Sequence, residues 1–176
     1  MTNGIEDLIA RQRFYDLIVT YARAADRGDE ALMASVFHPD AEIVTGIIDG
    51  KAADYSRGMV RAIRENYSTM FHSLSNTYFE IDGDRAFGEA YVFAMALSKG
   101  TETLETLAGG RYLDRFEKRE GIWKIAHRTY VADWRITRPA SPAKPALDQT
   151  GPQRGGFAPN DPSLAFWAQA RASGRG

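Results

Sequence analysis

Four long apolar segments in the second half of the chain constrain its fold more than any other feature. The candidate strands are residues 75–81, 85–98, 103–118 and 122–134. Each break between them carries a glycine in a short polar turn: Asp82-Gly83-Asp84, Lys99-Gly100 and Glu120-Gly121. Such turns are typical of tight connections between neighbouring antiparallel strands. The pattern predicts an antiparallel meander.

The segment 85–98 is apolar on both of its faces. Alternation puts the large side chains on one face, namely Phe87, Tyr91, Phe93, Met95 and Leu97. The other face carries Ala86, Gly88, Ala90, Val92, Ala94 and Ala96. Because both faces should be covered, we expect the large face to line an interior where Phe87, Tyr91, Phe93 and Met95 bind an apolar substrate. The small face is suited to close packing against a second sheet, in the same chain or in a neighbouring subunit.

The residues before these strands predict helices. A first helix has one apolar face, made of Phe14, Leu17, Ile18, Tyr21 and Ala25. Asn3 and Glu6 resemble a capping box at its start, and Gly28 is placed to end it. Asp29 can cap a short second helix that reaches about Phe37, followed by a strand over 41–46 and a third helix over 59–71.

This order of elements predicts an α+β fold. Helices come first and a curved antiparallel sheet follows, so we expect the sheet to wrap around the first helix as a cone with a dead-end apolar cavity. Gly109 and Gly110 predict a bulge or strong bend in the third long strand, as a curved sheet requires.

The chain divides near Arg138 into a body and a tail. With 176 residues, 44% hydrophobic and 26% charged, one compact domain is expected, and we assign it to residues 1–137. Residues 138–176 hold six of the seven prolines. Within this tail, Asp161-Pro162 is a helix start followed by Leu164, Phe166 and Trp167. We expect this short helix to dock over the cavity mouth or on an adjacent subunit, the alternative being a disordered terminus.

Composition and motifs exclude several classes of function. Twenty-two basic and 23 acidic residues give a net charge of -1 without a Lys/Arg cluster, so no nucleic acid partner is expected. The chain has no apolar run of membrane-spanning length and no signal peptide pattern, which predicts a cytoplasmic protein and no membrane partner. It has no cysteine, and its three histidines lack metal-ligand spacing, so no metal site is expected. No phosphate-binding or Gly-x-Ser-x-Gly motif occurs, so we expect neither a nucleotide cofactor nor serine hydrolysis; acid–base chemistry or plain binding remains.

Asp26 and His72 are the strongest candidates for chemistry. Asp26 lies in the last turn of the first predicted helix, where the helix dipole disfavours a carboxylate. It could face the cavity, or simply pair with Arg23 or Arg27. His72 lies where the third predicted helix gives way to the sheet, and histidine is suited to accepting a proton near neutral pH.

Two further polar residues are expected to point inward. Tyr21 lies on the apolar face of the first helix, so its hydroxyl needs a partner. Regular alternation puts His127 with Trp123 and Ile125, and Arg128 on the other face with Tyr130 and Trp134. An inward guanidinium needs an anionic partner, which could be Asp26, another carboxylate such as Asp114 or Glu117, or a substrate oxygen. His38 and His127 are weaker catalytic candidates.

Three segments together resemble the SnoaL-like branch of the NTF2-like superfamily. They are Tyr21-Ala-Arg-Ala-Ala-Asp26-Arg-Gly-Asp, the Phe-His-x-x-x-Asn segment from Phe71 to Asn76, and the run from Gly109 to Arg128. The likeness covers roughly residues 5–137. It is nearest to the group of scytalone dehydratase, hexachlorocyclohexane dehydrochlorinase and bile acid 7α-dehydratase.

The resemblance implies an α+β cone, usually trimeric, that performs cofactor-independent elimination with a His/Asp dyad. Asp26 matches the dyad aspartate and His72 the dyad histidine. Tyr21 stands where the bile acid enzyme has tyrosine and the dehydrochlorinase has lysine, and Arg128 matches the pocket arginine of the dehydrochlorinase. The missing lysine argues against a chloride leaving group, and the second pocket histidine of scytalone dehydratase has no counterpart.

Together these features predict a dehydratase-like lyase acting on a small apolar molecule, aromatic or polycyclic. His72 would remove a proton from a carbon next to an activating group, and Asp26 would fix the tautomer of the imidazole. Arg128 or Tyr21 would stabilise the departing oxygen or an enolate. The same dyad suits an isomerase, a polyketide cyclase or a retro-aldol lyase. The other alternative is a non-catalytic ligand-binding module, like the small subunit of a ring-hydroxylating dioxygenase.

Overall fold

The computed structural model describes residues 4–140 and 155–172. The helices are α1 (Gly4–Arg27), α2 (Glu30–Ser35), α3 (Ala52–Asn66) and α4 (Pro162–Ala172). The strands are β1 (Phe37–Val44), β2 (Gly50–Lys51), β3 (Tyr67–Asp82), β4 (Arg85–Ser98), β5 (Leu104–Arg119) and β6 (Ile122–Pro139).

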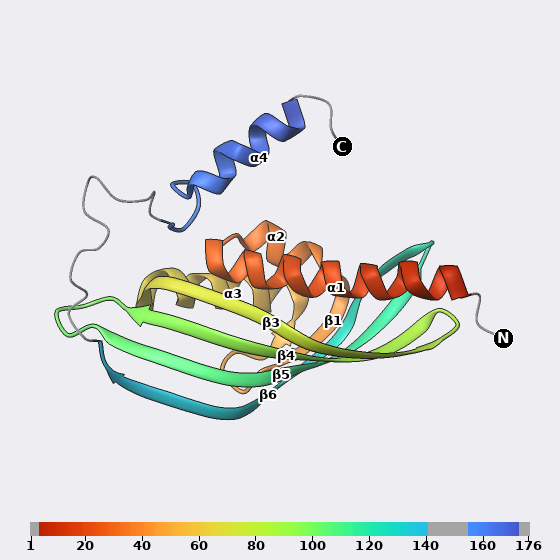
Figure 1. The fold of residues 1–176 in the computed structure, drawn as a ribbon, viewed down its shortest axis with the longest axis horizontal. Coiled ribbons are helices and arrows are strands. Elements are labelled where there is room, and N and C mark those ends of the chain that lie inside the picture. The colour runs from red at the N-terminus through yellow and green to blue at the C-terminus, as the bar shows by residue number, and fades with distance from the viewer. Residues whose placement is uncertain (1–3, 141–154, 173–176) are drawn as a thin grey trace.

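The described strands form one curved, open sheet in the order β2-β1-β6-β5-β4-β3. Strands β3 to β6 are the predicted antiparallel meander, and β1 joins the edge of β6 in parallel. Helices α1, α2 and α3 lie along one face of this sheet (Figure 1). The predicted α+β cone, a curved sheet around the first helix, is confirmed.

Helix α1 packs its apolar face onto the sheet. Its Phe14 is fully buried and stacks on Phe116 of β5, with ring centroids 4.4 Å apart. The helix ends at Gly28, whose φ of 59° is a left-handed conformation, and Asp29 then caps α2 by accepting a hydrogen bond from the Leu32 amide at 2.9 Å. Both predicted boundaries are confirmed. The capping box expected from Asn3 lies outside the described residues.

The predicted third helix over 59–71 is wrong at both ends. Helix α3 occupies Ala52–Asn66, and the chain is extended from Tyr67, where φ is -119° and ψ is 146°. From there β3 pairs along the whole length of β4, so that His72 lies opposite Ala94. Long-range strand pairing therefore overrides the helical periodicity of residues 67–71. His72 lies on a strand and not at a junction.

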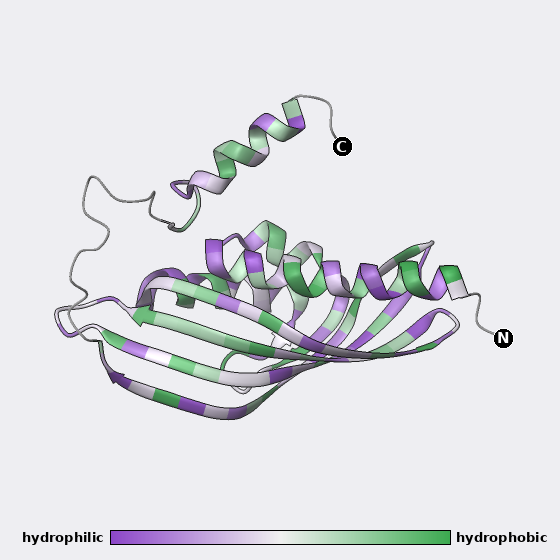
Figure 2. Cartoon of the chain, in the orientation of Figure 1, coloured by the Kyte–Doolittle hydropathy of each residue, from purple (hydrophilic) through white to green (hydrophobic). Residues whose placement is uncertain are grey.

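The two faces of β4 are reversed relative to the prediction. Its small residues face the helices, whereas Phe87, Tyr91 and Phe93 are 55%, 42% and 39% exposed on the outer face of the sheet. Figure 2 shows the strand as apolar along nearly its whole length. The inner face must be small because aromatic rings from other elements fill the interior. A Cβ added to Gly88, for example, would lie 2.6 Å from the Phe79 ring.

Two irregularities change the alternation along β6. The predicted bulge is confirmed: the β5–β6 register shifts between Gly109 and Gly110, which turns Trp134 to the outer face, contrary to expectation. A second shift, between Arg115 and Phe116, buries both Ile125 and Ala126 and places His127 on the outer face. The expected grouping of His127 with Trp123 and Ile125 is therefore wrong.

The tail returns to the helical side of the molecule. Helix α4 follows Asp161 as predicted, and Asp161 accepts a hydrogen bond from the Ser163 amide at 3.0 Å. Arg23 of α1 donates a hydrogen bond to Ser163 Oγ of α4 at 3.3 Å. Figure 1 shows α4 on the same side of the sheet as α1, α2 and α3. None of the helices in the part of the chain that the structure describes has the length and apolar character needed to span a bilayer.

Candidate active site

Asp26 and His72 meet between the last turn of α1 and strand β3. Asp26 Oδ1 lies 2.6 Å from His72 Nδ1, and Asp26 Oδ2 accepts the His72 backbone N–H at 3.2 Å. Their side chains are 13% and 10% exposed. One carboxylate thus holds both the ring and the backbone of the same histidine, and the contact expected from the sequence is present.

The geometry assigns different roles to the two nitrogens of the imidazole. Because a carboxylate accepts hydrogen bonds, it favours the tautomer in which Nδ1 carries the proton. Nε2 then has a free lone pair, and no residue in the described ranges forms a hydrogen bond with it. A histidine in this state can accept a proton at Nε2.

The arrangement accounts for a carboxylate at the negative end of a helix. Asp26 gains two hydrogen bonds from His72, one of them short, which offset the unfavourable helix dipole. The alternative partners are engaged elsewhere. Arg27 Nε lies 3.2 Å from Asp161 Oδ1, and Arg23 donates to Ser163.

The inward face of the sheet beside His72 is apolar, with small residues on β4 and β5. Ala94 is its partner on β4, and Ala108 of β5 is the partner of Ala94. Both are half-buried, as are the flanking Met70 and Leu74 of β3. None of these four residues is charged, so this part of the inner face offers only apolar contacts.

Arg128 and Tyr21 form a separate, fully buried cluster. Arg128 is 0% exposed, and its Nε and Nη2 each donate to Asp114 at 2.7 Å. The guanidinium lies between the rings of Tyr21 and Tyr112, 4.2 Å from each centroid. The Tyr21 hydroxyl is hydrogen-bonded to that of Tyr55. No hydrogen bond or ion pair between described residues joins this cluster to the dyad.

The ionisation of this cluster follows from burial. Burial raises the pKa of Tyr55 and Tyr112 well above the usual value, so both remain neutral. Burial opposes the charge on Arg128, but Asp114 outweighs it and the pKa of Arg128 is raised. The anionic partner of Arg128 is therefore Asp114 and not Asp26. Sequence reasoning missed Tyr55, because the third helix was expected to begin at Met59.

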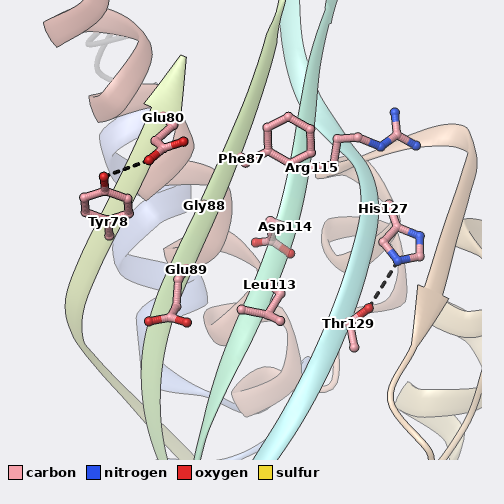
Figure 3. A pocket seen from close by; sticks show the side chains of 10 residues that line it. All are labelled: Tyr78, Glu80, Phe87, Gly88, Glu89, Leu113, Asp114, Arg115, His127 and Thr129. Atoms are coloured by element: carbon pink, nitrogen blue, oxygen red, sulfur yellow. Dashed lines mark hydrogen bonds between the residues drawn. The ribbon is translucent and has the colours of Figure 1, made fainter. Parts of the chain in front are cut away.

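The expected substrate-binding residues Phe87, Tyr91, Phe93 and Met95 are not beside the dyad. They belong to the outward alternation of β4, whereas Ala94, the strand partner of His72, faces inward. That outer face carries a shallow hollow of about 440 Å³ (Figure 3). It is lined by Phe87, Leu113 and His127, among others, and His127 Nε2 lies 3.2 Å from Thr129 Oγ1.

In the part of the chain that the structure describes, no group of three or more His, Asp or Glu side chains is arranged to hold a metal ion.

Comparison with known proteins relates this geometry to a family. The SnoaL-like domain matches residues 6–129. A search of curated proteins finds no match.

Solved structures share the fold at low sequence identity. A hexachlorocyclohexane dehydrochlorinase (LinA, type 2) aligns with a TM-score of 0.71 and 21% identity over 80% of this chain and 99% of its own. A scytalone dehydratase-like protein from Novosphingobium aromaticivorans DSM 12444 aligns with a TM-score of 0.67 and 18% identity, over 78% and 95%. A protein of unknown function from Mycobacterium tuberculosis aligns with a TM-score of 0.64 and 23% identity, over 76% and 77%. The domain match and the shared fold agree: the chain belongs to the SnoaL-like family of the NTF2-like superfamily.

Proposed function

We propose that the protein is a cofactor-independent lyase that eliminates water from a small apolar substrate, with His72 as the base. The observation that carries the proposal is the 2.6 Å contact between Asp26 Oδ1 and His72 Nδ1, with Nε2 left open. The family is consistent with it, since similar folds include a named dehydrochlorinase and a scytalone dehydratase-like protein.

In the proposed reaction, His72 Nε2 takes a proton from a carbon next to an activating group. The electron pair of that C–H bond forms the new C=C bond as the C–O bond to the neighbouring hydroxyl breaks. The imidazolium returns its proton to the departing hydroxide, which leaves as water. The Asp26 carboxylate stabilises the imidazolium, as a carboxylate behind a catalytic histidine does.

The substrate class is inferred from the strand neighbours of His72 on the inner face of the sheet. Met70, Leu74, Ala94 and Ala108 offer apolar contacts, which suits an aromatic or polycyclic compound. Arg128 is too buried to reach such a substrate. We therefore assign the Arg128–Asp114 pair to holding the ring of Tyr21, and not to binding a leaving group.

Titration of the three histidines by NMR tests the dyad without a substrate. In Asp26→Asn, the His72 ring is expected to lose its preference for the tautomer protonated at Nδ1, because the carboxylate that accepts this proton is gone. His38 and His127 serve as internal references. Burial and the nearby Arg119 lower the pKa of His38, and its Nε2 contacts the Glu117 carbonyl at 2.9 Å, so Asp26 should not affect it. If the His72 ring behaves identically in both proteins, the non-catalytic ligand-binding module is favoured over the lyase.

We further propose that the outer face of the sheet is covered by other copies of this chain. Large exposed side chains gather there, including Phe71, Tyr91, Phe93, Leu113, Trp134 and Ile136. Single soluble chains rarely expose so continuous an apolar surface, and the family resemblance favours a trimer.

Phe93→Lys is therefore expected to reduce the sedimenting species to the mass of one chain, because it places a charge within this face. Ile47→Lys is the matched control, since Ile47 is an exposed apolar residue in the β1–β2 loop. Sedimentation velocity measures both. A wild-type protein that already sediments as a single chain, or a Phe93→Lys protein that stays assembled, would contradict this assignment.

A further inference from the structure

We propose that Arg64 and the tail segment 155–161 form a strap that positions Asp26 against His72. This inference rests on the proposed dyad and adds a positioning role for residues that touch neither member of it. The strap is defined by contacts among α3, the end of α1 and the tail, which are far apart in sequence and meet at one point.

The end of α1 leaves the backbone carbonyls of Asp26, Arg27 and Gly28 without a backbone donor from the helix. The Gly28 amide donates to Ala25 O at 3.2 Å and the Asp29 amide to Ala24 O at 2.9 Å, which closes the helix. The carbonyl of Asp26, which comes next, accepts a hydrogen bond from Arg27 Nη1 at 3.4 Å. The carbonyls of Arg27 and Gly28 are bound by other segments of the chain. The Ala158 amide of the tail donates to Arg27 O at 2.8 Å, and Arg64 Nε of α3 donates to Gly28 O at 2.9 Å.

Arg64 joins the three segments with a single guanidinium. Besides Gly28 O, it reaches the tail, where Nη2 donates to Ala158 O at 2.9 Å. This close approach needs a glycine at position 28. A Cβ there would lie 2.9 Å from Arg64 Nε and 3.4 Å from the Phe157 ring, and the φ of 59° is itself unfavourable for other residues.

Asp161 fixes the other end of the strap. It is 4% exposed, lies 3.2 Å from Arg27 Nε, and accepts hydrogen bonds from the amides of Gly156 and Ser163. Burial opposes its charge, but the Ser163 and Gly156 hydrogen bonds and Arg27 hold the pKa of Asp161 below its ordinary value. It therefore remains ionised at neutral pH.

These contacts act on the turn that carries Asp26, because Asp26 directly precedes Arg27. The dyad requires its carboxylate within hydrogen-bonding distance of both Nδ1 and the amide of His72. Arg64 and Arg27 also bring positive charge to the negative end of the helix, where Asp26 lies. If the strap is released, the last turn of α1 can fray and the carboxylate moves away from the imidazole.

Arg64→Met tests the strap, because it keeps the aliphatic stem and removes every donor. The histidine titration should then show His72 displaced toward its behaviour in Asp26→Asn. The rate of the base-catalysed ring opening of 5-nitrobenzisoxazole should fall about tenfold to a hundredfold, the scale of a small misplacement of a catalytic group. Arg64→Lys, which keeps the charge and one donor group, should restore part of the wild-type NMR behaviour of His72 and part of the turnover rate. Arg61→Met is the matched control on the same exposed side of α3, and it should behave as wild type.

The outcomes separate the strap from the dyad. If Asp26→Asn displaces the His72 titration and Arg64→Met leaves it at wild-type values, the strap is wrong and the proposed function stands. If Asp26→Asn itself has no effect on His72, the proposed function fails first. Should Arg64→Met not fold, Asp161→Asn loosens the tail from Arg27 without altering α3, and the same displacement of His72 is expected of it.

Discussion

Replacing His72 with alanine is expected to reduce general-base turnover by about 10²–10⁴-fold, the usual contribution of a positioned proton acceptor. The reason is that Nε2 is the lone pair that the dyad leaves open, and no other described residue is held by Asp26 in this way. The ring opening of 5-nitrobenzisoxazole measures this without knowledge of the natural substrate. The reaction needs only one base, and the compound is apolar and aromatic.

Asp26→Asn should reduce the same rate at least tenfold, because an amide neither fixes the tautomer nor stabilises the imidazolium. The matched control is His127→Gln, which removes a histidine from the outer face of the sheet and should leave the rate unchanged. If His72→Ala and Asp26→Asn each stay within about tenfold of wild type, the dyad mechanism is wrong. If only His127→Gln loses the rate, the reacting base lies in the outer hollow of Figure 3.

The meander could be predicted because it rests on local features, whereas the pairing of Asp26 with His72 was predicted from the family resemblance. The turns around Gly83, Gly100 and Gly121 have positive φ, and the strand between the first two spans residues 85–98 as expected. Asp26 stands out in the sequence because a carboxylate at a helix end is unfavourable. The residues alone left open that Asp26 pairs with Arg23 or Arg27 or faces water; in the structure His72 supplies the contact.

The predictions that failed depend on contacts between distant segments. Alternation shows that Phe93 and Ala94 face opposite ways, but it does not say which of them faces α1. That is decided by rings such as Phe14 and Phe116, which leave room only for small residues on the inner face of β4. A bulge within β6, at Ala126, turned His127 outward, because an inserted residue reverses the alternation after it.

The partner of Arg128 was left open for a related reason. Strand register pairs Arg128 with Asp114, whereas the sequence offered several carboxylates of equal merit. Once the register is known, the choice is clear, because both side chains point inward from directly opposed positions and meet in a bidentate ion pair.

Asp114→Ala is expected to lower the free energy of unfolding by about 3–5 kcal/mol, the cost of leaving a buried charge without its partner. That is a large part of the roughly 5–15 kcal/mol that holds a domain of this kind together. Arg128 would lose both of its 2.7 Å hydrogen bonds while remaining enclosed by Tyr21 and Tyr112. Its Nη1 is already buried without a partner among the described residues, so the remaining donors cannot be satisfied nearby. Urea denaturation measures the change.

Two controls separate the buried pair from an ordinary ion pair and from a catalytic group. Glu105→Ala breaks the more exposed contact with Arg138, of similar length at 2.8 Å, and should cost less than about 1 kcal/mol. The double variant Asp114→Leu, Arg128→Met should recover most of the stability, since apolar residues of similar volume can replace a buried pair. It should also keep turnover of 5-nitrobenzisoxazole near wild type, because Arg128 does not touch the dyad. A stable double variant without turnover would instead return Arg128 to the reaction, as the family resemblance implies.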